Sequence, residues 1–186
     1  MRKSIRVAAV LLIWAALLPA AGSSAYKMSA APQAGVPPPL GVAESFRVLG
    51  AATVTNTGPT VIDRDLGVSP GSAITGFPPG IVKPPGMIHS ADAVAQQAQS
   101  DVTTAYNALV GQACDVNLTG QNLGGLVLTP GVYCFDTLAQ LTGVLTLNTQ
   151  GNLNAVFIFK IGSTLTTASN SSVVFSNGDA TCNVFW

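Results

Sequence analysis

Two four-residue segments place hydroxyl and amide side chains at matching positions. Thr57-Gly58-Pro59-Thr60 and Thr167-Ala168-Ser169-Asn170 both read threonine, a small residue, any residue, and then threonine or asparagine. Ser69-Pro70-Gly71-Ser72 is a degenerate third copy. Threonine is common on any half-exposed strand, but it also combines a stiff χ1 torsion with one methyl and one hydroxyl group. A flat array of such side chains suits contact with a neutral, extended surface such as a sugar polymer or ice.

Groups that could carry out acid–base or nucleophilic chemistry are sparse, because only 9% of the residues are charged. Asp63 and Asp65 could form the carboxylate pair of a glycosidase, but Arg64 between them favours solvated or loop-pinning roles. We assign His89, the only histidine, to a turn or to the start of a helix. The cysteine spacings match no zinc pattern. We therefore expect no enzyme, no cofactor and no metal site.

The first 25 residues have the features of a secretory signal peptide. Met1–Arg6 is basic, Val7–Leu18 is an apolar run that is short for a membrane span, and Ser23-Ser24-Ala25 supplies small residues for cleavage. We therefore expect a secreted protein without a membrane partner after cleavage. Residues 26–39 are predicted to form a disordered linker rich in proline and alanine, and residues 40–186 a single folded domain.

The charge that remains after cleavage is negative, because the signal peptide takes Arg2, Lys3 and Arg6 with it. The basic residues that are left are scattered and form no patch, which argues against nucleic-acid and anionic-membrane partners. Export also permits a disulfide. Cys114 and Cys134 flank a short polar segment with glycine whose loop a disulfide could close, whereas Cys182 lies in an apolar run and is predicted to be a buried thiol.

One long helix is predicted at about residues 90–110, a segment without glycine or proline. Ser90 is placed to cap its start, Asp92 suits the first turn, and Gly111 is placed to end it. The apolar side chains on one face of this helix are mostly small, so we expect that face to lie close against a β-structure. The apolar positions on one face are Ala91, Val94, Ala98, Val102, Ala105 and Leu109.

The rest of the chain is predicted to be mostly β, with short strands separated by frequent corners. Val156–Phe159 is continuously apolar and is predicted to be a central, buried strand, with Tyr133 and Phe135 also in the core. Frequent corners and a single helix favour an irregular β-solenoid, although a β-sandwich stays open on these residues alone. The other strand candidates are Phe46–Thr57, Val61–Val68, Ala73–Phe77, Leu123–Leu128, Gly131–Phe135, Leu141–Leu147, Ala155–Ile161 and Ser172–Phe175.

Several segments resemble, in order along the chain, the large microbial family of ice-binding (antifreeze) proteins. The likeness covers residues 40–186. The segments that carry it are TVTNTGPTVIDRDLGVSPG at 53–71, GFPPG at 76–80, the alanine- and glutamine-rich helix at 91–106, LVLTPGVYCF at 126–135, AVFIFKIGSTLTT at 155–167 and CNVFW at 182–186.

This resemblance implies a discontinuous, right-handed β-solenoid of triangular cross-section, with the long helix along one side and a capping segment near it. It implies an ice-binding face with Thr57, Thr60, Thr167 and Asn170 on or beside it, and Ser69 and Ser72 as the degenerate copy. It also implies that a Cys114–Cys134 disulfide staples the capping region. Family domains usually continue past the segment that ends at Trp186, so we expect a solenoid that lacks its C-terminal rungs.

The function expected from these observations is that of a secreted monomer that adsorbs to ice and inhibits its growth or recrystallisation. The alternative is an extracellular β-solenoid module for polysaccharide binding or adhesion, for which exposed aromatic side chains would be expected. A β-helical lyase or hydrolase would need clustered Asp, Lys and Arg side chains, which this chain lacks.

Overall fold

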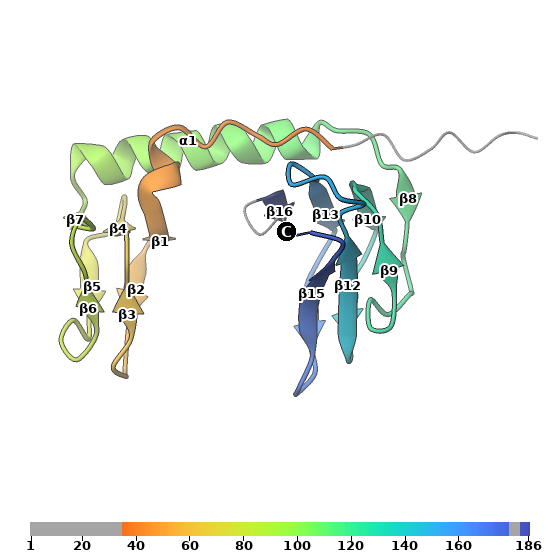
Figure 1. Ribbon diagram of the computed structural model, residues 1–186. Helices are drawn as coiled ribbons and strands as arrows, with labels where there is room; N and C mark the ends of the chain where they lie inside the picture. Colours follow the sequence, from red (N-terminus) through yellow and green to blue (C-terminus); the bar gives the residue numbers. More distant parts are fainter. Residues whose placement is uncertain (1–34, 179–182) are drawn as a thin grey trace, which may run out of the picture. The chain divides into compact units, whose positions relative to one another are not determined.

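The computed structural model, which describes residues 35–178 and 183–186, consists of short parallel strands and one long helix that lies along one side of them (Figure 1). The chain passes through three different sheets in turn and then returns to pair beside the strand that it left one turn earlier. The strand pairs are parallel, and the chain visits the three sheets in the same order in successive turns. This topology is a β-solenoid, and it rules out the antiparallel β-sandwich left open by the sequence.

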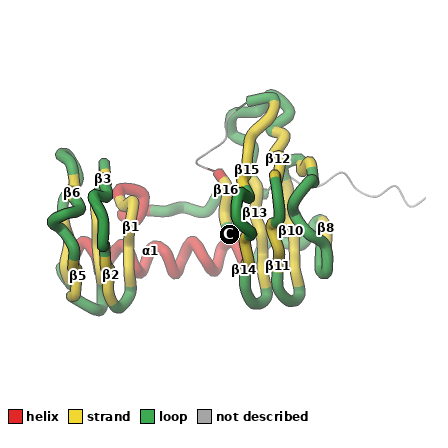
Figure 2. Tube along the Cα trace, turned by 90° about the horizontal axis from the view of Figure 1, so that it is seen from below, coloured by secondary structure: helices red, strands yellow, loops and turns green. Residues whose placement is uncertain are grey.

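The first stack of turns precedes the long helix. Its sheets are β1-β4-β7, β2-β5 and β3-β6, so each complete turn contributes one strand to each of the three sheets (Figure 2). Its elements are η1 (Gly41–Ser45), β1 (Phe46–Gly50), β2 (Thr53–Thr55), β3 (Val61–Ile62), β4 (Asp65–Val68), β5 (Ala73–Thr75), β6 (Ile81–Val82) and β7 (Ile88–Ser90).

The second stack follows helix α1 (Ala93–Val110) and repeats the same order of sheets. These sheets are β16-β13-β10-β8, β11-β14 and β15-β12-β9. The strands are β8 (Val116–Asn117), β9 (Val127–Leu128), β10 (Gly131–Phe135), β11 (Ala139–Leu141), β12 (Val144–Asn148), β13 (Phe157–Ile161), β14 (Leu165–Thr167), β15 (Ser172–Ser176) and β16 (Val184–Phe185).

Strand β13 is buried on both sides, as its continuous apolar sequence predicted. Phe157 and Phe159 face the interior of the second stack, where they join the main cluster of buried side chains. Ile158 points to the opposite side and packs in a smaller cluster with Leu109 of α1. Because successive side chains of a strand alternate, the two clusters fill the inside of the solenoid and the layer beneath the helix. The Trp186 ring stacks on Phe159 with centroids 4.1 Å apart.

The residue that caps helix α1 lies two positions after Ser90, the proposed cap. Asp92 is the capping residue, because its Oδ1 accepts a hydrogen bond from the Ala95 N–H at 2.9 Å. Ser90 instead ends strand β7 and donates its hydroxyl to the Ser72 carbonyl at 2.8 Å. The assignment of Ser90 as the cap was therefore wrong, since its backbone is still needed by the β-ladder. Gly111 ends the helix as expected.

The segment before η1 is held against the end of α1. The Gln112 side chain donates to the Val36 carbonyl and accepts from the Val36 N–H, at 2.7 and 2.8 Å. Lys160 of β13 donates to the carbonyls of Val110 and Gln112. Gly35 is buried, and a Cβ there would lie 2.7 Å from Ile158. Gly35 and Val36, at the end of the expected linker, thus contact the folded domain; the expected signal peptide and residues 26–34 lie outside the described residues.

A disulfide joins Cys114 to Cys134, with Cα atoms 6.0 Å apart and twenty residues of sequence separation. This confirms the pairing that the resemblance implied. Cys134 lies in β10, and Cys114 lies between α1 and β8. The bond therefore links the segment that follows the helix to the second stack. Cys182 lies outside the described residues.

Removing this disulfide is expected to destabilise the protein by about 3 kcal/mol, because the closed loop limits the entropy of the unfolded chain. Urea unfolding of wild type with and without a reductant measures the effect. The double variant Cys114→Ser/Cys134→Ser serves as the control, since reductant should not shift its midpoint. An unchanged wild-type midpoint after complete reduction would contradict this account of the disulfide.

Candidate functional site

The sheet β2-β5 presents threonine hydroxyls outward from the first stack. Thr53 pairs with Ala73 and Thr55 pairs with Thr75, and all four side chains are exposed. Val54 lies between the two threonines of β2 and is half-buried beneath them. The Thr75 hydroxyl donates to the Thr55 hydroxyl at 3.3 Å, so the two neighbouring rungs hold these side chains in register.

The corresponding sheet of the second stack continues the same pattern with longer polar side chains. Gln140 pairs with Thr166, and both are exposed between core-facing neighbours. An isolated bridge aligns Asn122 with Gln140. We name the outward side of these two sheets the threonine face. It has a first-stack patch and a second-stack patch, composed respectively of Thr53, Thr55, Ala73 and Thr75, and of Asn122, Gln140 and Thr166.

The threonine face carries no Asp, Glu, Lys or Arg among these residues. The nearest charge along the second-stack chain is Asp136, in the turn before β11, whose carboxylate accepts from the Asn117 amide at 3.0 Å. In the first stack, Arg47 bonds Asp63 at 2.9 Å, and this hydrogen bond lowers the pKa of the Asp63 carboxyl. The charged groups thus pair with protein partners at the edges of other elements and leave the face neutral.

The tetrad Thr57-Gly58-Pro59-Thr60 forms the corner after β2. Thr57 is exposed directly beyond the strand, whereas the Thr60 hydroxyl donates to Asn56 Oδ1 at 2.6 Å. The Asn56 amide group in turn donates to the carbonyls of Gly58 and Gly76. Thr60 therefore helps to fix the corner through Asn56, while Thr57 lies beside the first-stack patch.

The tetrad Thr167-Ala168-Ser169-Asn170 occupies the equivalent corner after β14. Thr167 pairs with Leu141, whose side chain faces the core, so Thr167 belongs to the inward column of that ladder although it is exposed. Asn170 is exposed in the turn, with a φ of 63°. The outward residue of this strand is Thr166, one position before the residue selected from the sequence.

The degenerate copy Ser69-Pro70-Gly71-Ser72 joins β4 to β5 at a different corner. Ser69 is only 3% exposed, so its assignment to a surface-contact face was wrong. Its N–H donates to the Gly50 carbonyl, which places Ser69 inside the turn. Ser72 is exposed, and its carbonyl accepts from Ser90.

Sequence reasoning from the tetrads missed the strand residues Thr53, Thr55, Thr75 and Thr166. A signal for them was present in the sequence, because Thr53-Val54-Thr55 and Ala73-Ile74-Thr75 both place a small residue, threonine or alanine, on either side of a larger apolar residue. The parallel register of these two segments aligns them residue for residue. Alternation with a repeated spacing therefore indicates the outward positions better than the corner tetrads do.

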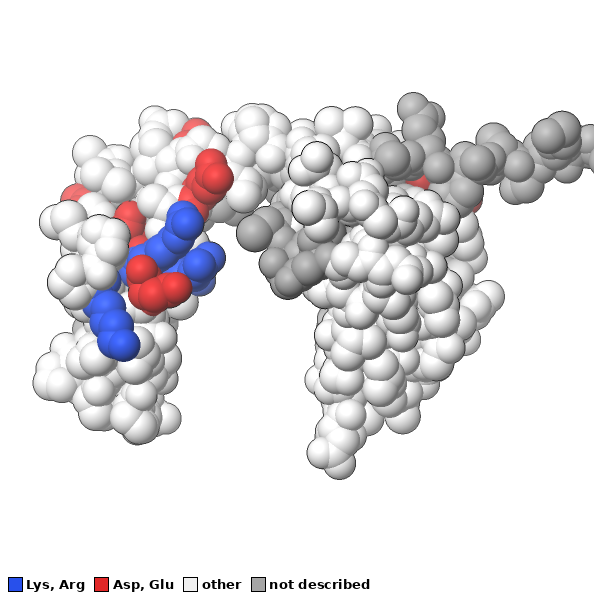
Figure 3. Space-filling model, viewed as in Figure 1, with Lys and Arg blue, Asp and Glu red and all other residues white. Residues whose placement is uncertain are grey.

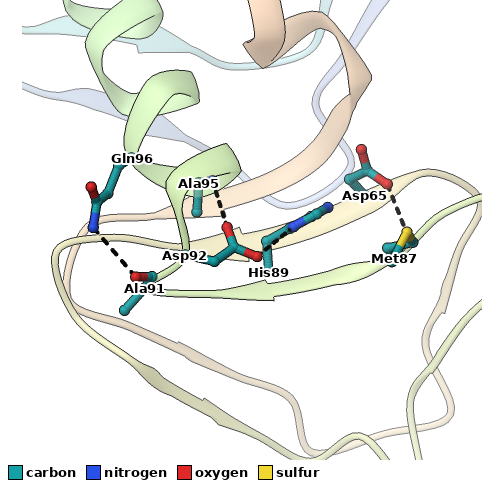
Figure 4. Close-up of polar contacts among 7 residues, drawn as sticks. All are labelled: Asp65, Met87, His89, Ala91, Asp92, Ala95 and Gln96. Atoms are coloured by element: carbon teal, nitrogen blue, oxygen red, sulfur yellow. Dashed lines mark hydrogen bonds and ion pairs between the residues drawn. The ribbon is translucent and has the colours of Figure 1, made fainter.

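A cluster of titratable groups at the start of α1 serves the fold. His89 is buried, and its Nδ1 lies 2.7 Å from Asp92 Oδ2, while Asp92 also caps the helix (Figure 4). Asp65 accepts from the Met87 N–H at 2.9 Å. These contacts confirm the predicted role of His89 at the start of a helix and that of Asp65 in pinning a loop. No group of three or more His, Cys, Asp or Glu side chains in the described part of the chain could hold a metal.

Acid is expected to destabilise the protein through Asp92. The hydrogen bonds from the Ala95 N–H and from His89 lower the pKa of this carboxyl below its ordinary value. Its stabilising contribution is therefore complete above about pH 4 and is lost as the pH falls through the lowered value. Thermal unfolding from pH 7 to pH 2 measures this effect against Asp92→Asn, which keeps a capping oxygen. The difference in melting temperature between wild type and Asp92→Asn should shrink in acid. A difference that does not depend on pH would contradict this role of the Asp92 carboxylate.

Comparison with known proteins gives consistent matches. The model of a family described as ice-binding-like matches residues 48–186. An ice-binding protein of Nostoc sp. (strain HG1) is 61% identical over 147 residues, which are 79% of this chain and 54% of the relative. Ice-binding protein 1 of Shewanella frigidimarina is 31% identical over 85% of this chain and 21% of its own length. The chain thus spans about half the length of the Nostoc relative.

Solved structures match the fold closely. The crystal structure of an ice-binding protein from the Antarctic ascomycete Antarctomyces psychrotrophicus has a TM-score of 0.77 and 39% identity, over 81% of this chain and 73% of that chain. An ice-binding protein from an Antarctic biological consortium has a TM-score of 0.78 and 42% identity, over 84% and 70%. Separately, none of the helices in residues 35–178 and 183–186 is long and apolar enough to cross a membrane.

Proposed function

Because this chain belongs to the ice-binding-like protein family, we propose that it adsorbs to ice through the threonine face and thereby hinders ice growth or recrystallisation. The single observation that carries the assignment to this face is the in-register pairing of exposed, uncharged residues on adjacent rungs, with Thr55 beside Thr75. We further propose that the protein is a secreted monomer and acts by binding alone, without catalysis.

The geometry of parallel strands explains why such a face suits ice. Neighbouring rungs lie about 4.8 Å apart, and outward residues of one strand repeat at roughly 6.6–6.8 Å, which are spacings close to repeats of the ice lattice. A charged side chain would keep its own hydration shell and disturb ordered water at the surface. Threonine contributes a methyl group and a hydroxyl group on a stiff torsion.

Rigidity matters because adsorption to a crystal returns little free energy with which to offset lost side-chain entropy. The threonine face meets this requirement through its neighbours. The Thr55 and Thr75 hydroxyls already share a hydrogen bond, and the corner beyond them is fixed by Asn56. In the second-stack patch, Asn122 Oδ1 accepts from the N–H groups of Gly124 and Thr142, which fixes its amide group.

Polysaccharide binding is the alternative function, and a direct comparison separates the two. Purified protein at micromolar concentration is tested for shaping of single ice crystals, for inhibition of recrystallisation and for retention on glycan resins. The proposal expects faceted crystals, arrested grain growth and no retention. Unshaped crystals together with retention on a glycan resin would assign the protein to the alternative class.

A further inference from the structure

A second charge-free grid of side chains lies on the sheet β15-β12-β9, which the proposed function does not use. The β12–β15 ladder pairs five residues in unbroken register. Alternation directs Val144 and Thr146 outward, beside Ser172 and Val174 of the neighbouring rung. We name this surface the valine face; its residues are Val127, Val144, Thr146, Ser172, Val174 and Ser176.

The valine face is the outer side of a well-packed ladder. Leu145 and Leu147 alternate with its outward residues and are completely buried in the core of the second stack. At its edge, Asn148 Oδ1 accepts from the Asn177 amide and from the Gln150 N–H, both at 2.9 Å. Packing beneath β12 and these hydrogen bonds at its edge fix the positions of the outward side chains of that strand.

Methyl and hydroxyl groups dominate this surface, and no charged residue belongs to it. In the view of Figure 3, Lys, Arg, Asp and Glu gather over the first stack, whereas the surface over β9, β12 and β15 shows none. The equivalent sheet of the first stack pairs Val61 with Ile81, but Asp63 and Lys83 follow directly after those strands. Only the second stack therefore offers a neutral grid on this side of the solenoid.

We infer that the valine face is a second ice-contact surface, separate from the threonine face; this inference rests on the proposed function. The grid has the strand spacings that make the threonine face suitable, and it has a longer ladder of five pairs against three for β11–β14. Its exposed valines order the water around their methyl groups. Thr146, Ser172 and Ser176 add hydroxyl groups that can join that water.

The composition of the valine face favours ice over a protein partner. Cores of protein interfaces are enriched in aromatic residues, methionine and arginine, which form their energetic anchors. The valine face has only small side chains in a regular array. Such an array presents no large side chain to insert into a partner, whereas it matches a periodic, uncharged surface.

Two faces built from different sheets of one solenoid turn should adsorb to different sets of crystal planes. Single ice crystals grown in the presence of fluorescently labelled protein reveal which planes are covered. Wild type is expected to mark two sets of planes. The variant Thr55→Lys/Thr166→Lys should lose one set and keep the other, and Val174→Lys should show the reverse pattern.

Val174→Lys has a matched control in Val94→Lys on α1, because both valines are 41% exposed. An ammonium group on the valine face resists dehydration, so the concentration that arrests recrystallisation should rise by about tenfold, whereas Val94→Lys should behave as wild type. Thermal unfolding of both variants confirms that they are folded. If Val174→Lys matches Val94→Lys while Thr55→Lys/Thr166→Lys loses activity, the valine-face inference is overturned and the proposed function stands.

Association through the valine face is tested with the same proteins by analytical ultracentrifugation. Wild type and Val174→Lys are both expected to sediment as monomers. A wild-type dimer that Val174→Lys dissociates would assign this face to a second copy of the chain and overturn the inference. A wild type that marks no plane and shapes no crystal would instead defeat the proposed function itself.

Discussion

Thr55→Lys should raise the concentration needed to arrest ice recrystallisation by about tenfold, a loss of roughly 1.4 kcal/mol in adsorption free energy. Thr55 lies outward on β2, paired with Thr75 and bonded to its hydroxyl. Lysine at this position removes that hydrogen bond and places a strongly hydrated ammonium group on the neutral patch. The measurement is grain growth in sucrose solution held below freezing, over a dilution series of each protein.

The matched control is Thr103→Lys. Thr103 is an exposed residue of α1 whose hydroxyl donates to the Gln99 carbonyl within the helix. It belongs to neither face, so this variant carries the same substitution and the same added charge with no expected change in activity. Equal activity of the two lysine variants would mean that the first-stack patch does not contact ice.

Gly76→Ala should destabilise the protein by more than about 4 kcal/mol, the size of effect reserved for severe local disruption. Gly76 has a φ of 78°, and a Cβ there would lie 1.8 Å from the Asn56 carbonyl oxygen. Alanine therefore meets both backbone strain and a backbone clash. The clash displaces Asn56, which fixes the corner through Gly58, Gly76 and Thr60. Urea unfolding followed by circular dichroism measures the loss.

Gly58→Ala is the control at the same corner. A Cβ at Gly58 would meet no atom within 4 Å, so alanine fits there without displacing a neighbour. Gly58→Ala is expected to unfold at nearly the wild-type urea concentration and to keep its effect on ice. Similar midpoints for the two alanine variants would show that the close approach at Gly76 does not constrain this corner.

The sequence predicted the elements with the strongest patterns. A long 3.6-residue period without glycine or proline identified α1 to within three residues at its start. The predicted apolar face was wrong in part, because Val94 and Val102 are exposed and the buried residues of the helix are Ala95, Ala98 and Ala105. The continuous apolar run at 156–159 identified a strand buried on both sides. The resemblance to the family supplied the solenoid topology and the Cys114–Cys134 pairing, neither of which composition or spacing could decide alone.

The corners were harder to predict, because several of them lack glycine and proline. The expected strand Val61–Val68 divides into β3 and β4 at Asp63 and Arg64, two residues typical of any exposed strand edge. The expected strand Leu141–Leu147 also divides, between β11 and β12, but that corner contains Gly143, whose φ of 95° shows that glycine was the available signal. A solenoid can turn at Asp63 and Arg64 because each corner stacks on the corner of the next rung, a tertiary contact with no local sequence signal.

The outward direction of individual threonines was the least predictable feature. Thr166 and Thr167 are adjacent and chemically identical, yet the register with Gln140 and Leu141 sends them to opposite sides of the sheet. A shift of one residue reverses every side chain of a strand. Only the pairing of the rungs fixes that register, and the tetrad pattern therefore did not identify the outward strand residues.

The central claim, that the threonine face contacts ice, is tested most directly by the fraction of protein that enters a slowly growing ice crystal. Wild type, Thr55→Lys/Thr166→Lys and Thr103→Lys are compared in the same solution with distinguishable labels. We predict that wild type and Thr103→Lys enter the ice equally and that the double variant enters at a clearly lower fraction, through the valine face alone. Equal incorporation of all three proteins would contradict the claim.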